Sequence, residues 1–216
     1  MSRAGWSRED MARRVAADIP DGSYVNIGVG LPVLVPGFVP SDREIVYHSE
    51  NGILGMGPPP APGAEDPELI NANKQMVTLV AGGAYFHHTD AFVMMRGGHI
   101  DIAVLGAFQV SERGDLANWT TGDSSMPPAV GGAMDLAAGA RRILVMMTHT
   151  TKDGSPKLLP RCTYPLTAAG VVDRVYTDLA VLDVGAAEGA LVVREIAPGV
   201  TRSDLVAATA AKLVFP

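Results

Sequence analysis

Hydrophobic residues recur along the chain with two spacings, and each spacing predicts a different kind of element. Apolar positions three or four residues apart predict four helices, over residues 7–19, 90–96, 133–138 and 205–213. Ser7 and Thr201 are placed to cap the first and the last of these helices. Short runs rich in Val, Ile, Leu and Tyr predict strands over residues 24–27, 44–47, 75–80, 100–105, 143–147, 171–184 and 191–196.

The predicted strands and helices alternate over most of the chain, which is the order expected of an α/β fold. The strand at 100–105 is so apolar that we expect it to be buried on both faces. This predicts an open, largely parallel sheet covered by helices. We find no internal repeat or domain boundary, so we expect a single domain over residues 1–216. The proline-rich stretch 58–67 is expected to be a surface loop, either a lid or an interface.

Composition narrows the class of protein. With 47% hydrophobic and 19% charged residues, the chain of 216 residues is expected to be globular. The net charge of −6 and the absence of a Lys and Arg cluster argue against a nucleic-acid surface. No apolar run approaches a membrane span, and residues 1–10 lack the apolar core of a signal peptide. The single cysteine, Cys162, fits a reducing compartment, so we expect a cytoplasmic protein without a membrane partner.

Glu50 is the residue best placed to carry chemistry. It follows the strand predicted at 44–47 and precedes three glycines, Gly52, Gly55 and Gly57. We therefore expect Glu50 on a tight turn at the carboxyl end of a strand, where open α/β sheets bind ligands. The alternative is a surface turn carrying a solvated acid.

A second glycine-rich turn follows the strand at 24–27, in Gly28-Val29-Gly30-Leu31-Pro32. Glycines followed by Pro at a helix start suit the binding of an anion. The third glycine of a dinucleotide fingerprint is missing. A β-to-α turn that simply requires small residues is the equal alternative.

Other chemistry finds little support in the residues. The histidines show no metal-ligand spacing, so we predict no metal site; they are His48, His87, His88, His99 and His149. Cys162 has no His in its neighbourhood, and Ser49 is not in a nucleophile elbow. Glu50 could act as a general base or as a nucleophile. No second carboxylate flanks it, and the following glycines can let backbone N–H groups approach an oxyanion, which favours the nucleophile.

Several blocks together resemble the second (B) subunit of the 3-oxoacid CoA-transferase family. They stand in the expected order over nearly the whole chain, at 24–31 (YVNIGVGL), 49–58 (SENGILGMGP), 69–75 (LINANKQ), 96–110 (RGGHIDIAVLGAFQV), 114–119 (GDLANW) and 131–136 (GGAMDL). Asn73 stands where the family usually has Gly. The 3-oxoadipate type is the closer match, because residues 82–88 and 162–167 are similar to it. In addition, the segment 120–130 has no Lys, whereas the acetoacetate type typically carries a basic segment there.

The resemblance implies a CoA-transferase (NagB-RpiA-like) architecture and a ping-pong reaction. In that reaction CoA moves from succinyl-CoA to 3-oxoadipate, a step of the β-ketoadipate pathway of aromatic degradation, through a glutamyl-CoA thioester on Glu50. CoA is then a substrate and a covalent intermediate, and no cofactor is bound permanently. The alternatives are acetoacetate or another 3-oxoacid as acceptor and, more remotely, a non-catalytic CoA-sensing domain.

The resemblance also implies supporting residues and a partner. Asn26 and Lys74 resemble residues near bound CoA, and Gly106 is a candidate backbone donor. Residues expected to help bind CoA or support an oxyanion further include Gly28, Asn51 and Gly52. The family's A subunit normally brings a glycine-rich CoA motif and an oxyanion side chain. We therefore expect this chain to need an A subunit, in an A2B2 assembly.

Overall fold

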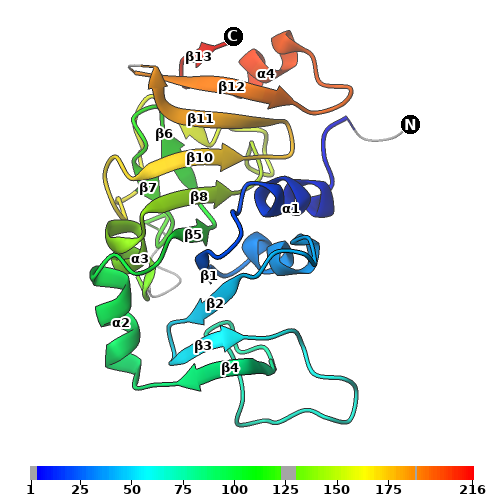
Figure 1. Ribbon diagram of the computed structural model, residues 1–216. Coiled ribbons are helices and arrows are strands. Elements are labelled where there is room, and N and C mark those ends of the chain that lie inside the picture. The colour runs from blue at the N-terminus through cyan, green and yellow to red at the C-terminus, as the bar shows by residue number, and fades with distance from the viewer. Residues whose placement is uncertain (1–3, 123–129, 188) are drawn as a thin grey trace.

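The computed structural model describes residues 4–122, 130–187 and 189–216. Within them the main sheet has ten strands in the order β13-β12-β11-β10-β8-β5-β1-β2-β3-β4 (Figure 1). These are β1 Tyr24–Ile27, β2 Val46–Ser49, β3 Ile53–Met56, β4 Leu79–Tyr85, β5 Ile102–Leu105, β8 Arg142–Met146, β10 Val172–Tyr176, β11 Ala180–Ala187, β12 Ala190–Ile196 and β13 Leu213–Val214. A small second sheet contains β6 Gln109–Ser111, β7 Leu116–Ala117 and β9 Leu158–Leu159. The helices are α1 Arg8–Ala17, the 3-10 helix η1 Leu31–Phe38, α2 His88–Arg96, α3 Ala133–Gly139 and α4 Arg202–Ala208.

The centre of the main sheet is parallel. The neighbours β2, β1, β5, β8 and β10 pair in parallel, while β3 and β4 at one end and β11 and β12 at the other pair antiparallel. The chain adds β2 on one side of β1 and later adds β5 on the other side. The strand order therefore reverses between β1 and β5, which makes this the switch point of the sheet. The predicted α/β class with an open, largely parallel sheet is confirmed.

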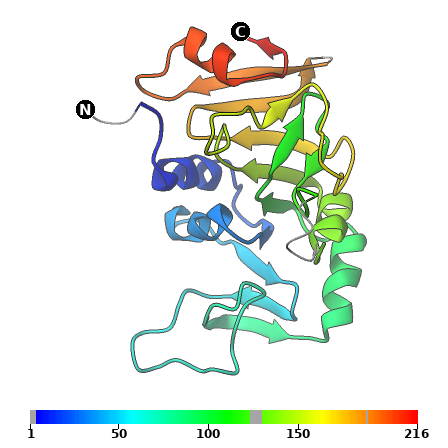
Figure 2. The ribbon, with the colours of Figure 1, turned by 180° about the vertical axis from the view of Figure 1, so that it is seen from behind.

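Both faces of the parallel strands are covered. Ile102 and Val104 of β5 belong to a core with α1, whereas Ala103 and Leu105 belong to a core with Leu136 of α3. Alternate residues of a strand point to opposite faces, so the continuous apolar run of β5 serves two cores. Figures 1 and 2 show α1 and η1 together on one side, with α2, α3 and the small sheet on the other.

The predicted capping residues of the first and last helices are confirmed, although α2 starts at His88 and α4 at Arg202, earlier than the predicted 90 and 205. Ser7 and Thr201 each form a capping box, with Asp10 and Asp204 respectively. The final helix nevertheless ends at Ala208 rather than at 213. Thr209 has an extended backbone, and Leu213 then pairs in parallel with β12. A strand that completes the sheet therefore replaces the predicted last turn of the helix.

The strand predictions were less accurate at their boundaries. The strand predicted at 44–47 runs from Val46 to Ser49, and β3 was not predicted because glycines interrupt it. The strand predicted at 75–80 occupies Leu79–Tyr85. The run predicted as one strand at 171–184 is divided into β10 and β11 by a hairpin turn, in which Thr177 Oγ1 accepts from the amides of Leu179 and Ala180. The short strands of the second sheet lie in segments that carry turn signals and were not predicted.

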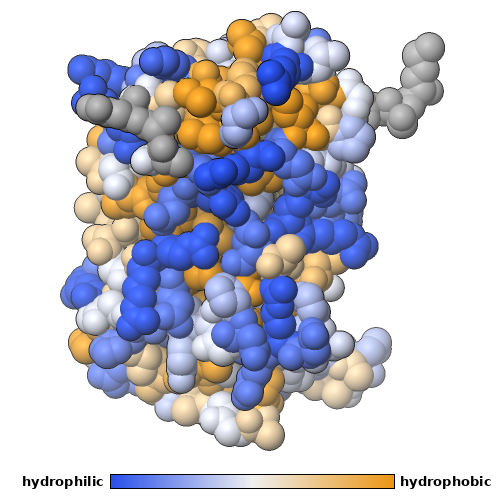
Figure 3. Space-filling view, turned by 45° about the horizontal axis from the view of Figure 1, so that its top comes forward, coloured by the Kyte–Doolittle hydropathy of each residue, from blue (hydrophilic) through white to orange (hydrophobic). Residues whose placement is uncertain are grey.

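The surface is unevenly apolar. In the view of Figure 3, apolar side chains gather at the end of the molecule that carries α4 and β13, where Val206 is exposed. Polar side chains dominate the middle of that view. The proline-rich stretch 58–67 forms an extended loop between β3 and β4, anchored where Thr78 donates to the Pro58 carbonyl.

Candidate active site

Glu50 lies at the start of the three-residue turn that joins β2 to β3. The pairs His48–Leu54 and Ser49–Ile53 close this antiparallel hairpin. Because β2 also pairs in parallel with β1, the turn projects from the carboxyl edge of the parallel strands. This is the placement that the sequence predicted for Glu50.

The glycines after Glu50 allow close packing of the hairpin. Gly52 has a φ of 113°, and a Cβ there would lie 2.3 Å from the carbonyl oxygen of Phe86. The Gly52 amide donates to the Ser49 carbonyl at 3.0 Å, and the Gly57 amide donates to the Thr78 carbonyl at 2.7 Å. Both amides are therefore already engaged within the chain, and donors to an oxyanion have to come from elsewhere.

The hairpin also holds a neighbouring loop against the site. Ser49 Oγ accepts a hydrogen bond from the Ala72 amide at 3.0 Å, and Asn51 Nδ2 donates to the Ile70 carbonyl at 2.7 Å. Ala72 and Asn73 consequently reach the wall of the cavity described below, whereas Asn51 does not line it. Asn51 thus positions the loop rather than facing the cavity.

Lys74 lies farther out on the same loop. It is exposed, has a positive φ of 60°, and does not line the cavity. Its amide donates to the Asn71 carbonyl at 2.9 Å, which closes the turn. An exposed ammonium beside the cavity suits a peripheral phosphate, and this role of Lys74 stays a prediction.

Asn26 of β1 and His48 of β2 form a buried pair. The Asn26 amide nitrogen lies 3.0 Å from His48 Nδ1 and donates to the His48 carbonyl at 3.2 Å. Since Nδ1 accepts here, the imidazole proton lies on Nε2, for which the described residues offer no partner. Burial lowers the pKa of His48 to about 4, so the ring is neutral. The Asn26 oxygen is the part of that side chain left to face a ligand.

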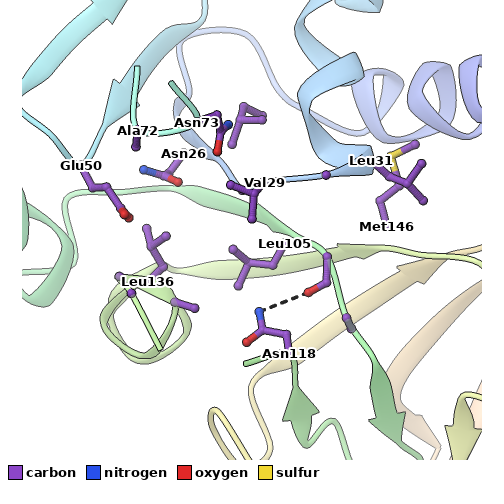
Figure 4. Close-up of a pocket in the computed structure, with 18 of the residues that line it drawn as sticks. Asn26, Val29, Leu31, Glu50, Ala72, Asn73, Leu105, Asn118, Leu136 and Met146 are labelled. Atoms are coloured by element: carbon purple, nitrogen blue, oxygen red, sulfur yellow. Dashed lines mark hydrogen bonds between the residues drawn. The ribbon is translucent and has the colours of Figure 1, made fainter. Parts of the chain in front are cut away.

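These residues surround a cavity of about 450 Å³ at the carboxyl edge of the sheet. Its walls come from the segments after β1, β2, β5 and β8, together with α3 and the loop 71–73. It therefore opens at the switch point between β1 and β5, where α/β sheets bind ligands. Figure 4 shows Glu50 directed toward α3 and Leu136, with Asn26 and Asn73 beside it, across from Leu136.

The Glu50 carboxylate rests directly against the start of α3. A Cβ on Gly132 would lie 2.2 Å from Glu50 Oε2, so only glycine leaves room for the carboxylate in this position. Burial raises the pKa of Glu50, nearby Asp135 raises it further, and His88 opposes the shift. A carboxylate that is partly stripped of water in this way is a better nucleophile than a solvated one.

Gly28 and Gly106 end the two strands that flank the switch point, and both line the cavity. The Gly28 amide donates to the Val104 carbonyl at 2.8 Å, and a Cβ on Gly28 would meet that same oxygen at 2.9 Å. Gly28 therefore packs closely against β5, where a side chain has no room. The Gly106 carbonyl accepts a hydrogen bond from Asn118 Nδ2 at 3.2 Å, which fixes the peptide after β5 (Figure 4).

Sequence reasoning missed most of the cavity wall, including Gly132, Asn118 and Lys157. The first two lie in blocks that carried the family resemblance, but neither has a recognisable chemical pattern around it. Lys157 is an isolated lysine that the fold of the loop after β8 brings to the cavity. The segment 123–129, which includes most of the region without Lys, lies outside the described residues.

Other reactive groups do not form a second centre within the described ranges. No cluster of three His, Cys, Asp or Glu residues there could hold a metal ion. Burial raises the pKa of the Cys162 thiol to about 11, so it stays protonated at neutral pH.

Within residues 4–122, 130–187 and 189–216, no helix combines the length and apolar character of a bilayer span.

Comparison with known proteins places this geometry in context. The family model described as "Coenzyme A transferase" matches residues 8–208. The B subunit of the 3-oxoadipate CoA-transferase of Pseudomonas putida is 66% identical over 178 residues, covering 82% of this chain and 83% of the relative. The corresponding B subunit from Acinetobacter baylyi, also of a 3-oxoadipate CoA-transferase, is 52% identical over 214 residues, covering 99% and 98% of the two chains.

A solved structure shares the fold at lower sequence identity. The crystal structure of an acyl-CoA transferase apoenzyme from Escherichia coli O157:H7 matches with a TM-score of 0.73 and 22% identity. The match covers 100% of this chain and 43% of the other, so the present chain spans less than half of that protein.

Proposed function

The chain belongs to the coenzyme A transferase family, and from this premise we propose that it is the B subunit of a transferase that moves CoA from succinyl-CoA to 3-oxoadipate. The observation that carries the proposal is the placement of Glu50, a partly desolvated carboxylate on the wall of a cavity at the switch point. The two relatives named as 3-oxoadipate CoA-transferase subunits support the choice of acceptor.

The first half-reaction transfers CoA to the enzyme. A Glu50 oxygen attacks the thioester carbonyl of succinyl-CoA, and the carbon–sulfur bond breaks to give a mixed anhydride and CoA thiolate. The thiolate then attacks the glutamyl carbonyl of the anhydride. The carbon–oxygen bond breaks there, which releases succinate and leaves a glutamyl-CoA thioester on Glu50.

The second half-reaction reverses these steps with the acceptor. A carboxylate oxygen of 3-oxoadipate attacks the glutamyl thioester and expels CoA thiolate, which again forms an anhydride. The thiolate attacks the 3-oxoadipyl carbonyl and regenerates the Glu50 carboxylate. No proton is gained or lost overall, and the thioester energy is retained because one thioester replaces another. Each step is feasible because a thiolate, whose parent thiol has a pKa of roughly 8.5, is a good leaving group.

The surroundings of Glu50 suit this sequence of steps. The carboxylate is partly buried beside α3, so water has limited access to an anhydride, which would otherwise hydrolyse. Each tetrahedral intermediate carries an oxyanion, and losing one donor to such a charge typically costs about 3–4 kcal/mol. The Gly106 amide, at the end of β5, is our candidate for one of these donors, and Asn118 holds the adjoining peptide in place.

The chain is expected to act together with an A subunit. Both relatives are named as B subunits, which implies a partner chain. We propose that the A subunit completes the walls of the cavity in a cytoplasmic A2B2 assembly and supplies the glycine-rich CoA motif that this chain lacks. CoA enters as a substrate and leaves with the product.

The test is a coupled assay with both subunits, succinyl-CoA and 3-oxoadipate, which should form 3-oxoadipyl-CoA. Glu50→Gln should abolish this activity, whereas Glu44→Gln, at an exposed acid just before β2, should leave it intact. Borohydride reduction after incubation with succinyl-CoA should modify Glu50 in the wild type. Activity of Glu50→Gln within tenfold of the wild type would sink the nucleophile assignment.

Two other outcomes identify the alternatives. A higher kcat/KM with acetoacetate than with 3-oxoadipate would show that the acceptor is another 3-oxoacid, with the same use of Glu50. Reversible CoA binding without any borohydride-dependent modification of Glu50 would indicate a CoA-sensing domain instead of an enzyme.

A further inference from the structure

Lys157 stands out among the residues that line the cavity. Of the described lining residues, it is the one lysine or arginine, and Glu50 is the one acid. It is half-buried in the loop after β8, where its amide donates to the His149 carbonyl at 3.2 Å. Its ammonium donates to Thr148 Oγ1 at 3.3 Å. The backbone of Lys157 is thus fixed, and its charge lies at the cavity.

The ammonium has more hydrogen-bonding capacity than these contacts use. It carries three N–H donors. Within residues 4–122, 130–187 and 189–216, one donor has a partner, and no carboxylate lies within ion-pairing distance of the ammonium. Asp178 acts on its charge from a distance, and Asp178 Oδ1 accepts from the His149 amide at 2.8 Å. Burial lowers the pKa of Lys157, and Asp178 opposes that shift. An anion in the cavity would supply the missing partner.

The distance from Glu50 fits one class of anion. The ends of β2, β1, β5 and β8 lie side by side in that order. At about 4.8 Å per strand, β2 and β8 are about 14 Å apart across the sheet. The register aligns His48 with Ile143, so Thr148 lies three residues farther along the strand direction than Glu50. A succinyl or 3-oxoadipyl group joined to Glu50 extends its distal carboxyl carbon roughly 10–12 Å from the Glu50 Cα, at about 1.2 Å per bond. Across the sheet, the gap that remains is about the length of a hydrogen bond, about 3 Å.

We propose that Lys157 binds the distal carboxylate of a dicarboxylic acyl group while its other end reacts at Glu50. This inference rests on the proposed CoA-transferase function and deepens it. Lys157 then selects succinyl and 3-oxoadipyl groups over acyl groups that end in a methyl, such as acetoacetyl. The other anion that could reach a lysine is a phosphate of CoA. Because every acyl-CoA carries that phosphate, a phosphate contact would affect all acyl-CoA substrates equally, whereas a contact with the distal carboxylate would affect only dicarboxylic acyl groups.

The experiment measures the first half-reaction alone, in the complex of both subunits. Single-turnover formation of the glutamyl-CoA thioester, trapped by borohydride and quantified by mass spectrometry, is followed with succinyl-CoA and with acetoacetyl-CoA. Lys157→Met keeps the length of the stem and removes the charge, and Lys157→Arg keeps the charge. Lys152→Met, at an exposed lysine in the same loop, is the matched control.

Lys157→Met should lower the ratio of the rate constant for thioester formation to Kd, measured with succinyl-CoA, by about 10- to 100-fold. This is the usual effect of losing a hydrogen bond to a charged group. The same ratio for acetoacetyl-CoA should change less than threefold. Lys157→Arg should recover much of the preference for succinyl-CoA over acetoacetyl-CoA, and Lys152→Met should behave as the wild type. An equal loss with both acyl-CoAs would assign Lys157 to a CoA phosphate and overturn the inference. An unchanged preference in Lys157→Met would overturn it too, while the reaction at Glu50 would still stand. If the wild type forms no glutamyl-CoA thioester, the proposed function itself fails.

Discussion

Replacing Gly132 by Ala tests whether the position of the Glu50 carboxylate controls the reaction. Gly132 is the N-cap residue of α3, with φ −80° and ψ 0°, a conformation that alanine adopts without strain. The added methyl group would lie 2.2 Å from Glu50 Oε2 and 2.8 Å from Glu50 Cδ. Because the carboxylate is the end of a flexible side chain, Glu50 rather than the backbone is expected to move.

The size of the effect follows from these contacts. Ordinary contact with a Cβ begins at 3.4 Å, so Oε2 has to move by about 1.2 Å. A misplacement of about 1 Å typically costs on the order of 100-fold in rate, or about 2.7 kcal/mol of transition-state stabilisation. The folded state should change by less than about 1 kcal/mol, because the loss of a glycine N-cap is offset by the lower entropy of the unfolded chain.

The assay combines steady-state kinetics of the two-subunit enzyme with denaturant unfolding of the same variant. Gly132→Ala should lower kcat/KM for succinyl-CoA by about 100-fold and leave the unfolding midpoint close to that of the wild type. Gly37→Ala is the matched control, since Gly37 is exposed and a Cβ there meets nothing within 4 Å. A Gly132→Ala enzyme within threefold of the wild type would refute the reasoning that this contact places the nucleophile.

Two further predictions concern stability and pH. Burial lowers the pKa of both His48 and His149 to about 4 from 6.5, so their contribution to stability is full above pH 6.5 and is lost as the pH falls through 4. Each histidine contributes up to about 3 kcal/mol to the free energy of unfolding. His48→Gln or His149→Gln should therefore flatten the decline in unfolding free energy between pH 7 and 4. Equal slopes of unfolding free energy against pH in the wild type and the variants would contradict this. For Glu50 the pKa is raised, so its contribution to stability is lost as the pH rises through that folded-state pKa. Glu50→Gln should therefore melt at the same or a higher temperature than the wild type at pH 7.5. A lower melting temperature of the variant would show that burial of the ionised Glu50 carboxylate does not destabilise the folded protein.

The order of elements and the turn that bears Glu50 were predictable because both depend on local signals. The capping boxes at Ser7 and Thr201, the apolar run of β5 and the glycine after Glu50 act within a few residues of chain. Gly28 was visible in the sequence too, but the contact that excludes a side chain there is with the Val104 carbonyl on the neighbouring strand. Ordered blocks of sequence then indicated the family, which the comparisons confirm.

Strand boundaries and the rest of the cavity depended on contacts between distant segments. The strand β3 forms through pairing with β4 despite its glycine, since Gly55 and Gly83 let the two backbones approach. Leu213 pairs with β12 instead of extending a helix, because the edge of the sheet offers hydrogen bonds that a helix end lacks.

The sequence alone thus determined the α/β class, the turn that bears Glu50 and the family to which the chain belongs. The three-dimensional arrangement determined what surrounds that carboxylate. Gly132 makes room for it from a position 82 residues away in the chain, and Lys157 reaches the same cavity from a loop with no motif of its own. The physical reason is that the parallel strands bring their carboxyl ends to one edge, so side chains far apart in sequence share one partly desolvated space.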